Sequence, residues 1–108
     1  MSWLNSLSSA SNTGSASAWS ADALLFDVRT PAEFEQGHVQ GAVNLPLDQF
    51  TQHYAALMPN RDHQIIVYCR SGARSGMAAQ FLQQQQYTQV INGGSVHETA
   101  QKAGRVIV

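Results

Sequence analysis

Short continuous runs of apolar residues mark the expected strands of this chain. They lie at residues 23–28 and 65–68, and a shorter one at 43–45 stops before Pro46. The mixed stretch at 87–92 is interpreted as one more short strand. Apolar runs of this length, without alternating polar positions, are typical of strands that are buried on both faces of a sheet. Gly93 and Gly94 follow the last stretch, so we expect that strand to end at Asn92.

Helix signals separate these strands. Thr30, Pro31 and Glu33 supply an N-cap, a first-turn proline and a capping-box glutamate, and Gly37 suits the end of that helix. Two further helices are predicted by apolar residues at helical spacing, the first with Phe50, Tyr54, Leu57 and Met58 and the second with Met77, Ala78, Phe81 and Leu82. The second begins near Arg74, and a last helix is expected at 98–103.

The alternation of strands and helices predicts an α/β fold, with a small parallel sheet flanked by helices on both faces. In such sheets, ligands bind beyond the carboxyl ends of the strands. Cys69 directly follows the 65–68 strand, and Asp27 and Arg29 stand at the end of the first strand. The sequence therefore predicts that these three residues share one edge of the sheet.

The length and the N-terminal composition predict the domain organisation. The 108 residues are enough for one compact domain with a modest core and too few for two. Eight serines occur in residues 1–20, a composition that favours solvated, flexible backbone. We therefore expect a flexible serine-rich arm at 1–20 and a single domain at 21–108.

Charge and hydropathy exclude several classes of partner. Six Lys and Arg are scattered among seven Asp and Glu, which leaves no basic patch for nucleic acid. No run approaches the ~18 apolar residues that a membrane span needs. The N-terminal residues also lack the basic and apolar regions of a secretory signal. We expect no nucleic-acid partner, no membrane and a cytoplasmic location.

Cys69 is the only cysteine of the chain. This excludes an internal disulfide, Cys-x-x-Cys redox chemistry and a thiolate-rich zinc site. The four histidines show no metal-binding spacing, so we expect neither a metal nor another cofactor. The thiol is expected to be free.

The loop that begins at this cysteine reads CRSGARS and ends at Ser75. A turn between a strand and a helix points successive backbone N–H groups inward, at the positive end of the helix dipole. These donors, together with Arg70 and Arg74, predict a lowered pKa for Cys69 and a nucleophile that needs no adjacent general base. An inert buried cysteine would instead have apolar neighbours.

Three stretches, LLFDVRTPAEFEQGHVQGAVNLPL, IIVYCRSGARS and YTQVINGG, make residues 24–94 resemble a single-domain rhodanese, of the thiosulfate sulfurtransferase family. In that family the cysteine that matches Cys69 carries a persulfide, and the loop that matches 70–74 surrounds its outer sulfur with N–H groups. The resemblance implies that Cys69 takes the sulfane sulfur of an anionic donor such as thiosulfate and releases sulfite. The sulfur then passes to cyanide or a thiol, protein thiols included.

Around this nucleophile we expect substrate-binding positions along the whole loop: Arg70, Ser71, Gly72, Ala73, Arg74 and Ser75. The two arginines suit a doubly charged donor through charge-assisted hydrogen bonds. Asp27 and Arg29 are expected to support the rim, with Glu33 paired to Arg29 one helical turn further on. His38 is not expected to be a catalytic base. Ser95 stands where many rhodaneses have a large apolar residue, which implies a differently built pocket wall.

Two other functions fit parts of the pattern. Phosphatases and arsenate reductases of related folds hold a tetrahedral oxyanion in a Cys-x5-Arg loop. Here Cys69 and Arg74 are spaced Cys-x4-Arg, a tighter ring that suits a single sulfur atom better. A non-enzymatic sulfur carrier or docking module would use the same persulfide, and the sequence leaves that alternative open.

Overall fold

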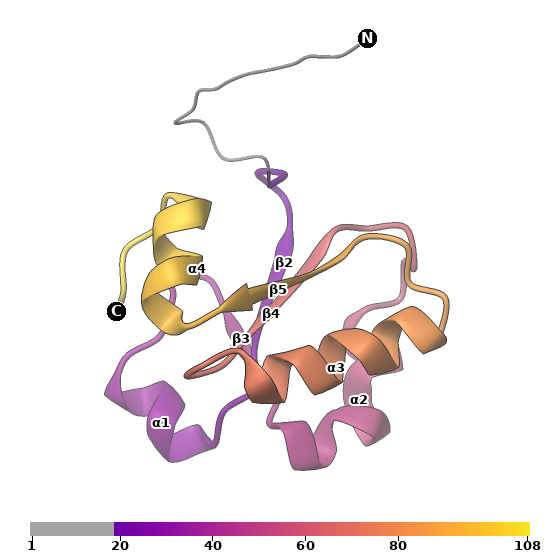
Figure 1. Cartoon of the computed structure of the whole chain (residues 1–108), viewed down its shortest axis with the longest axis horizontal. Coiled ribbons are helices and arrows are strands. Elements are labelled where there is room, and N and C mark those ends of the chain that lie inside the picture. Colours follow the sequence, from indigo (N-terminus) through magenta and orange to yellow (C-terminus); the bar gives the residue numbers. More distant parts are fainter. Residues whose placement is uncertain (1–18) are drawn as a thin grey trace, which may run out of the picture.

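Strand β4 (Ile65–Tyr68) lies in the middle of the sheet, as its unbroken apolar sequence requires. In the computed structural model, which describes residues 19–108, each of its four residues is 0% exposed. Strands β2 (Leu24–Asp27) and β5 (Val90–Gly94) pair with it in parallel, and β3 (Val43–Asn44) pairs with β2, which gives the order β3-β2-β4-β5. The predicted parallel sheet is confirmed (Figure 1).

Helices cover both faces of this sheet. They are α1 (Pro31–Gln36), α2 (Phe50–Leu57), α3 (Ala73–Gln84) and α4 (Val96–Ala103), with a short 3-10 turn, η1 (Leu47–Gln49), before α2. Ile65 and Val67 of β4 pack in the core cluster that contains residues of α2 and α3, whereas Ile66 and Tyr68 pack in the cluster that contains residues of α4. Figure 1 shows α2 and α3 on one side of the strands and α4 on the other.

Two capping boxes fix where α1 and α4 begin. Thr30 and Glu33 exchange the expected pair of hydrogen bonds before α1, at 3.3 and 3.1 Å. Ser95 and Glu98 exchange the same pair before α4, at 3.1 and 2.9 Å. The prediction that the last helix starts at residue 98 was wrong by two residues, because the Ser-x-x-Glu spacing is itself a start signal.

The prediction for the last strand was wrong at both ends. Tyr87 is not in β5 but is buried after a turn in which Gln86 has φ 70, and its hydroxyl donates to the Met58 carbonyl at 2.5 Å. At the other end the strand runs on through both glycines. Tyr68 pairs with Gly94 while Val67 pairs with Asn92, so Gly93 is an extra residue in β5.

Two of the apolar residues whose helical spacing predicted α2 and α3 are exposed. Leu57 is 41% exposed and Met77 is 63% exposed. The buried residues of α3 are Ser75, Ala78, Ala79 and Leu82. Met77 comes two positions after Ser75 and two before Ala79, which places it on the opposite side of the helix.

The ends of the described chain lie against the α4 side of the sheet. Trp19 packs against the cluster that contains Ala100 of α4, and Ile107 forms an antiparallel bridge with Val39. The predicted arm at 1–20 lies outside the described residues except for its last two. Within residues 19–108, no helix is both long and apolar enough to cross a membrane.

Gly93 is a position at which we expect a methyl group to be costly. A Cβ built there meets the Thr99 hydroxyl oxygen and comes within 3.2 Å of an Ile66 methyl carbon. Gly93→Ala should therefore lower the free energy of unfolding by ~1–3 kcal/mol, as overpacked cores do. Urea unfolding followed by circular dichroism measures this difference.

A second variant makes the cause specific. The Thr99 hydroxyl is buried and has no hydrogen-bond partner among the described residues, so Thr99→Ala removes the clashing oxygen without breaking a bond. Thr99→Ala should recover part of the stability lost in Gly93→Ala. The proposed clash would be contradicted if Gly93→Ala lowered the unfolding free energy as much in the Thr99→Ala protein as in the parent.

Candidate active site

Cys69 is held in place by the sheet and is nearly inaccessible. It directly follows β4, and its backbone N–H donates to the carbonyl of Gly94 in β5 at 3.0 Å. The residue is 1% exposed and belongs to the core cluster that packs under α3. The expected contrast between a buried and a reactive cysteine therefore does not hold, because this thiol is buried but has polar neighbours.

Three donors of the loop point at the sulfur. The Gly72 N–H lies 3.0 Å from Cys69 Sγ, the Ser75 N–H 3.5 Å and the Ser75 hydroxyl 3.3 Å. Gly72 has φ 96, a left-handed conformation that residues with a side chain rarely adopt. The loop can turn its N–H groups inward because glycine occupies this position.

The pKa of Cys69 is lowered by this geometry. Burial raises the pKa of the thiol, but hydrogen bonds from Ser75, Ser71 and Gly72 outweigh burial and bring it below its ordinary value. The predicted direction is confirmed. The main favourable contributions come from Ser75 and the loop N–H groups, whereas the sequence had suggested that the arginines share this role.

Asn92 of β5 fastens the loop, a role that the sequence analysis missed. Its Nδ2 donates to the Gly72 carbonyl at 3.0 Å, and its Oδ1 accepts from the Ser75 hydroxyl at 2.7 Å and from the Gly94 N–H at 3.1 Å. The only sequence signal was its place inside the stretch YTQVINGG. Its partners are distant in sequence, so only the folded chain reveals the contact.

The Ser75 hydroxyl has two acceptors and one hydrogen. Oγ lies 2.7 Å from Asn92 Oδ1 and 3.3 Å from Cys69 Sγ. When the thiol is protonated, its S–H can donate to Ser75 Oγ while the hydroxyl donates to Asn92. When the thiol ionises, the hydroxyl can rotate and donate its hydrogen to the sulfur instead. The hydrogen bonds can therefore adapt to the charge on Sγ without a shift of any heavy atom.

Arg74 is paired with Glu33 of α1, not free beside the thiol. The two side chains form a two-pronged ion pair, with N–O distances of 2.8 and 3.1 Å. Hydrogen bonds from Arg74 and from Thr30 lower the pKa of Glu33 to about 2. The predicted pairing of Glu33 with Arg29 was wrong, because Asp27 already occupies that guanidinium.

Asp27 and Arg29 form a second, buried ion pair at the same edge of the sheet. Asp27 is 0% exposed, and Arg29 Nη2 donates to its carboxylate at 2.6 Å, while Nε lies at 3.0 and 3.1 Å from the two oxygens. Nη2 also donates to the Gly37 carbonyl at 2.6 Å. The pair therefore ties the end of β2 to the end of α1, which supports the predicted role at the rim.

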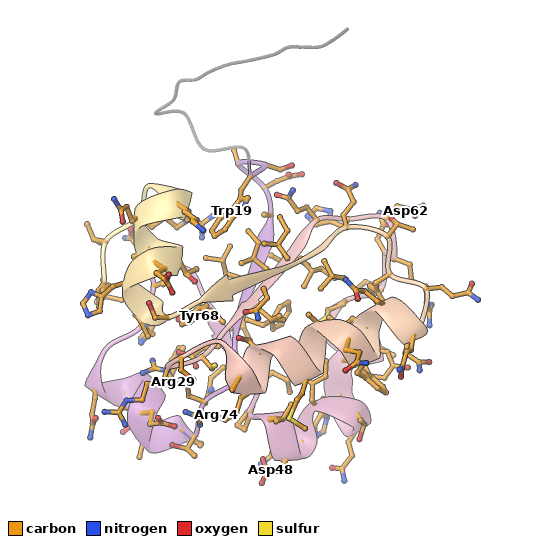
Figure 2. All side chains as sticks on the ribbon, viewed as in Figure 1. Trp19, Arg29, Asp48, Asp62, Tyr68 and Arg74 are labelled. Atoms are coloured by element: carbon orange, nitrogen blue, oxygen red, sulfur yellow. The ribbon has the colours of Figure 1, made fainter. Side chains whose placement is uncertain are left out.

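Arg70 is the exposed cation of the loop. Among residues 19–108 it forms no hydrogen bond or ion pair, and its side chain lines a cavity of about 370 Å³ with Arg29 and Ser95. Ser95 caps α4 and so has a structural role in that wall. Figure 2 shows Arg29 and Arg74 at the same end of the molecule, with Asp62 at the opposite end.

The family of this chain follows from comparison with known proteins. The rhodanese-like domain family matches residues 9–97. The chain belongs to the rhodanese family. Its sequence is 39% identical over 74 residues to thiosulfate sulfurtransferase PspE of Escherichia coli K12, a match that covers 68% of this chain and 71% of that protein.

Two further rhodanese relatives bear on the site. A solved structure described as "rhodanese with anions from E. coli" superimposes with a TM-score of 0.72 at 35% identity, over 80% of this chain and 96% of that one. A putative sulfur carrier protein of Bacillus subtilis, YrkF, is 37% identical over 68 residues, which is 63% of this chain and 36% of YrkF. Both enzymes and carriers are thus named among the relatives of this rhodanese domain.

The His38 side chain packs against α1. The His38 ring stacks on Phe34 of α1 at 3.6 Å, and its Nδ1 is 2.8 Å from the Phe34 carbonyl. The His38 backbone pairs with Val108, at 3.0 and 2.8 Å. In the described part of the chain, no three His, Cys, Asp or Glu side chains gather as a metal site.

The ion pair of Glu33 predicts a pH dependence of stability. The folded pKa of about 2 lies below the ordinary 4.5, so the stabilisation is complete above about pH 4.5 and is lost as the pH falls through 2. Glu33→Gln, which can still form the capping box, should lower the unfolding free energy by up to ~1 kcal/mol at pH 7 because the pair is partly exposed. The difference should shrink toward pH 2.

Urea unfolding of both proteins between pH 7 and pH 2 measures this change. Glu35→Gln removes an exposed carboxylate from the same helix and is the matched control. A Glu33→Gln effect that stayed constant down to pH 2 would show that the ion pair is not its cause.

The Ser75 hydroxyl should control the ionisation of the thiol. Ser75→Ala removes the Oγ donor but keeps the N–H donors, so the pKa of Cys69 should rise. The pH profile of Cys69 alkylation by iodoacetamide should shift to higher pH. Ser71→Ala is the control, because Ser71 contributes only its backbone N–H and should leave the profile unchanged.

Proposed function

We propose that this rhodanese is a sulfurtransferase that carries sulfur on Cys69. It takes a sulfane sulfur from a small anionic donor such as thiosulfate and passes it to cyanide or a thiol. The observation that carries this proposal is the set of three donors on Cys69 Sγ, which favours a thiolate without a histidine or carboxylate beside it. The sulfurtransferase named among the relatives supports it.

The loading step follows from the chemistry of the thiolate. Cys69 Sγ attacks the outer sulfur of thiosulfate, and a new S–S bond forms. The S–S bond of thiosulfate breaks, and its electron pair leaves with sulfite. The protein then holds a persulfide, whose outer sulfur would extend from Sγ toward the inward N–H groups of the loop 70–75.

The two arginines of the loop have different parts in this proposal. Arg70 is exposed and unpaired among the described residues, so it can bind the sulfonate end of the donor through charge-assisted hydrogen bonds. Arg74 is held by Glu33, so its part in the proposal is to fix the loop to α1. Ser71, Gly72, Ala73 and Ser75 contribute the backbone and hydroxyl donors.

The Arg74–Glu33 pair also argues against a phosphatase or arsenate reductase. An arginine that holds a phosphate or arsenate must present its guanidinium to the oxyanion. Arg74 Nη1 and Nη2 already donate to the Glu33 carboxylate. The Cys-x4-Arg spacing is also one residue shorter than the Cys-x5-Arg loop of those enzymes. We expect no phosphatase activity.

The second candidate function is that of a sulfur carrier. Its support is the similarity to YrkF, a putative sulfur carrier of which this chain spans about a third. A carrier would load one sulfur from thiosulfate and then wait for a protein acceptor. Steady-state turnover with thiosulfate and cyanide separates the two, since a carrier loads once and stalls. The cytoplasmic location stays a prediction.

Intact-protein mass spectrometry tests the proposed function. After thiosulfate, the parent should gain one sulfur atom and lose it to cyanide. Cys69→Ser should gain none, because a hydroxyl is scarcely ionised near neutral pH. Arg70→Ala should still load, but its kcat/KM for thiosulfate should fall about 10- to 100-fold, the loss of one charge-assisted contact.

Lys102→Ala is the matched control for net charge. Lys102 lies exposed on α4, in its last turn, so its removal changes the charge of the protein and not the loop. An equal loss in Lys102→Ala and Arg70→Ala would mean that Arg70 makes no direct contact. Sulfur uptake by Cys69→Ser, or none by the parent, would overturn the sulfurtransferase proposal.

A further inference from the structure

Asn92 belongs to β5, but its side chain makes three hydrogen bonds around the cysteine loop. Its Nδ2 donates to the Gly72 carbonyl at 3.0 Å, and its Oδ1 accepts from the Gly94 N–H at 3.1 Å. The third contact joins Oδ1 to the Ser75 hydroxyl oxygen, at 2.7 Å. That hydroxyl oxygen lies 3.3 Å from Cys69 Sγ, so a single side chain connects Asn92 to the sulfur.

The neighbours of Asn92 fix the orientation of its amide group. The Gly72 carbonyl can only accept a hydrogen bond, so it must face the NH2 group of Asn92. The Gly94 N–H can only donate, so it must face the oxygen. The Ser75 hydroxyl meets that same oxygen, which has no hydrogen of its own. In the contact between Ser75 and Asn92, the hydroxyl must therefore be the donor.

The Ser75 hydroxyl cannot donate to Asn92 and to Cys69 at the same time, because Oγ has one hydrogen. While the thiol is protonated, the hydrogen stays with Asn92. A thiolate attracts it, since hydrogen bonds to charged groups are the stronger ones. Asn92 Oδ1 and Ser75 Oγ then face one another at 2.7 Å with no hydrogen between them, which is unfavourable. Asn92 therefore opposes the movement of the hydrogen to the sulfur.

We propose that Asn92 is a positioning residue of this site, whose Oδ1 competes with Cys69 Sγ for the Ser75 hydroxyl hydrogen and releases it only when the thiol ionises. Asn92 thus makes ionisation less favourable than it would be with Ser75 alone. A consequence for the loaded protein rests on the proposed function. In the persulfide the charge lies on the outer sulfur and Sγ has two covalent bonds, so the hydroxyl hydrogen returns to Asn92.

Charged and titratable side chains around the loop also act on the thiol. The loop, the end of β2, α1 and α4 supply them, whereas β5 has none: they are Arg70, the Arg74–Glu33 pair, the Asp27–Arg29 pair, His97 and Glu98. All of them are kept in the variants below. A difference between those variants therefore reports on Ser75 and Asn92.

Asn92→Asp and Ser75→Ala, made singly and together, test the competition. Aspartate has the shape of asparagine, but its carboxylate holds the hydroxyl hydrogen more strongly. At a pH where Cys69 is mostly protonated in all four proteins, Asn92→Asp should slow alkylation by iodoacetamide about 10-fold or more. In the Ser75→Ala protein the same change acts only through its charge and the lost contact with Gly72, so the slowing should be smaller by about 3-fold or more. Equal slowing in both proteins would overturn the proposal.

Asn60→Asp is the matched control for charge. Asn60 is exposed, and its Oδ1 accepts from the Asp62 N–H at 2.9 Å, a contact that aspartate can keep. Figure 2 shows Asp62 at the end of the molecule opposite to Arg74. Asn60→Asp should leave the alkylation rate within about 2-fold of the parent, because solvent and salt screen a charge at that distance. Slowing as large as in Asn92→Asp would show that position 92 has no special role.

A measurement on the parent does not depend on how well a variant folds. The side-chain amide resonance of Asn92 is followed by NMR through the pH range in which Cys69 ionises. It should shift with the midpoint of Cys69 alkylation, because Oδ1 loses its hydrogen bond from Ser75 there. The amide of Asn44 donates to the carbonyls of Asp27 and Arg29 at 2.9 and 3.0 Å, so it is the control and should not follow that midpoint.

Failure of this proposal and failure of the proposed function give different results. An Asn92 resonance that ignores the ionisation of Cys69, or that follows it equally in Ser75→Ala, overturns the competition for the hydrogen whether or not sulfur is transferred. In protein loaded with thiosulfate, the Asn92 resonance should return toward its position in the protonated thiol. A parent that never loads sulfur overturns the proposed function, while the pH titration still decides the role of Asn92.

Discussion

The hydrogen bonds on the Cys69 sulfur decide the character of this site. Burial alone would keep the thiol protonated and inert, because an isolated thiolate is costly in an apolar core. Donors from Gly72 and Ser75 outweigh the effect of burial and lower the pKa of the thiol. The same loop thus buries the thiol and supplies the hydrogen bonds that lower its pKa.

The loop keeps this geometry because β5 supports it. Asn92 binds the loop at Gly72 and Ser75, while the Gly94 carbonyl holds the Cys69 N–H. The extra residue Gly93 in β5 lets Asn92 and Gly94 both take part, and it packs against Thr99 of α4. A stable strand pairing is therefore part of the chemistry, since a shift in β5 would move the donors away from the sulfur.

The three arginines at this edge of the sheet differ in whether a carboxylate neutralises them. Arg29 is neutralised by a buried aspartate, and Arg74 by a half-exposed glutamate. Both pairs join strand or loop to α1 and so stabilise the site more than they charge it. Arg70 has no such partner among the described residues. The positive charge offered to an anion therefore comes mainly from Arg70.

The sequence by itself determined the order of the elements, the parallel sheet and the place of Cys69 at the end of a central strand. These features depend on local patterns, namely apolar runs, capping signals and the loop motif. It predicted the lowered pKa of Cys69 for the right general reason. It could not assign Glu33 to Arg74, Asn92 to the loop, or Gly93 to a strand, and it placed Met77 on the wrong side of α3. Each of these is decided by residues that are far apart in sequence, or by which side of a helix meets the sheet, and only the tertiary structure brings such partners together.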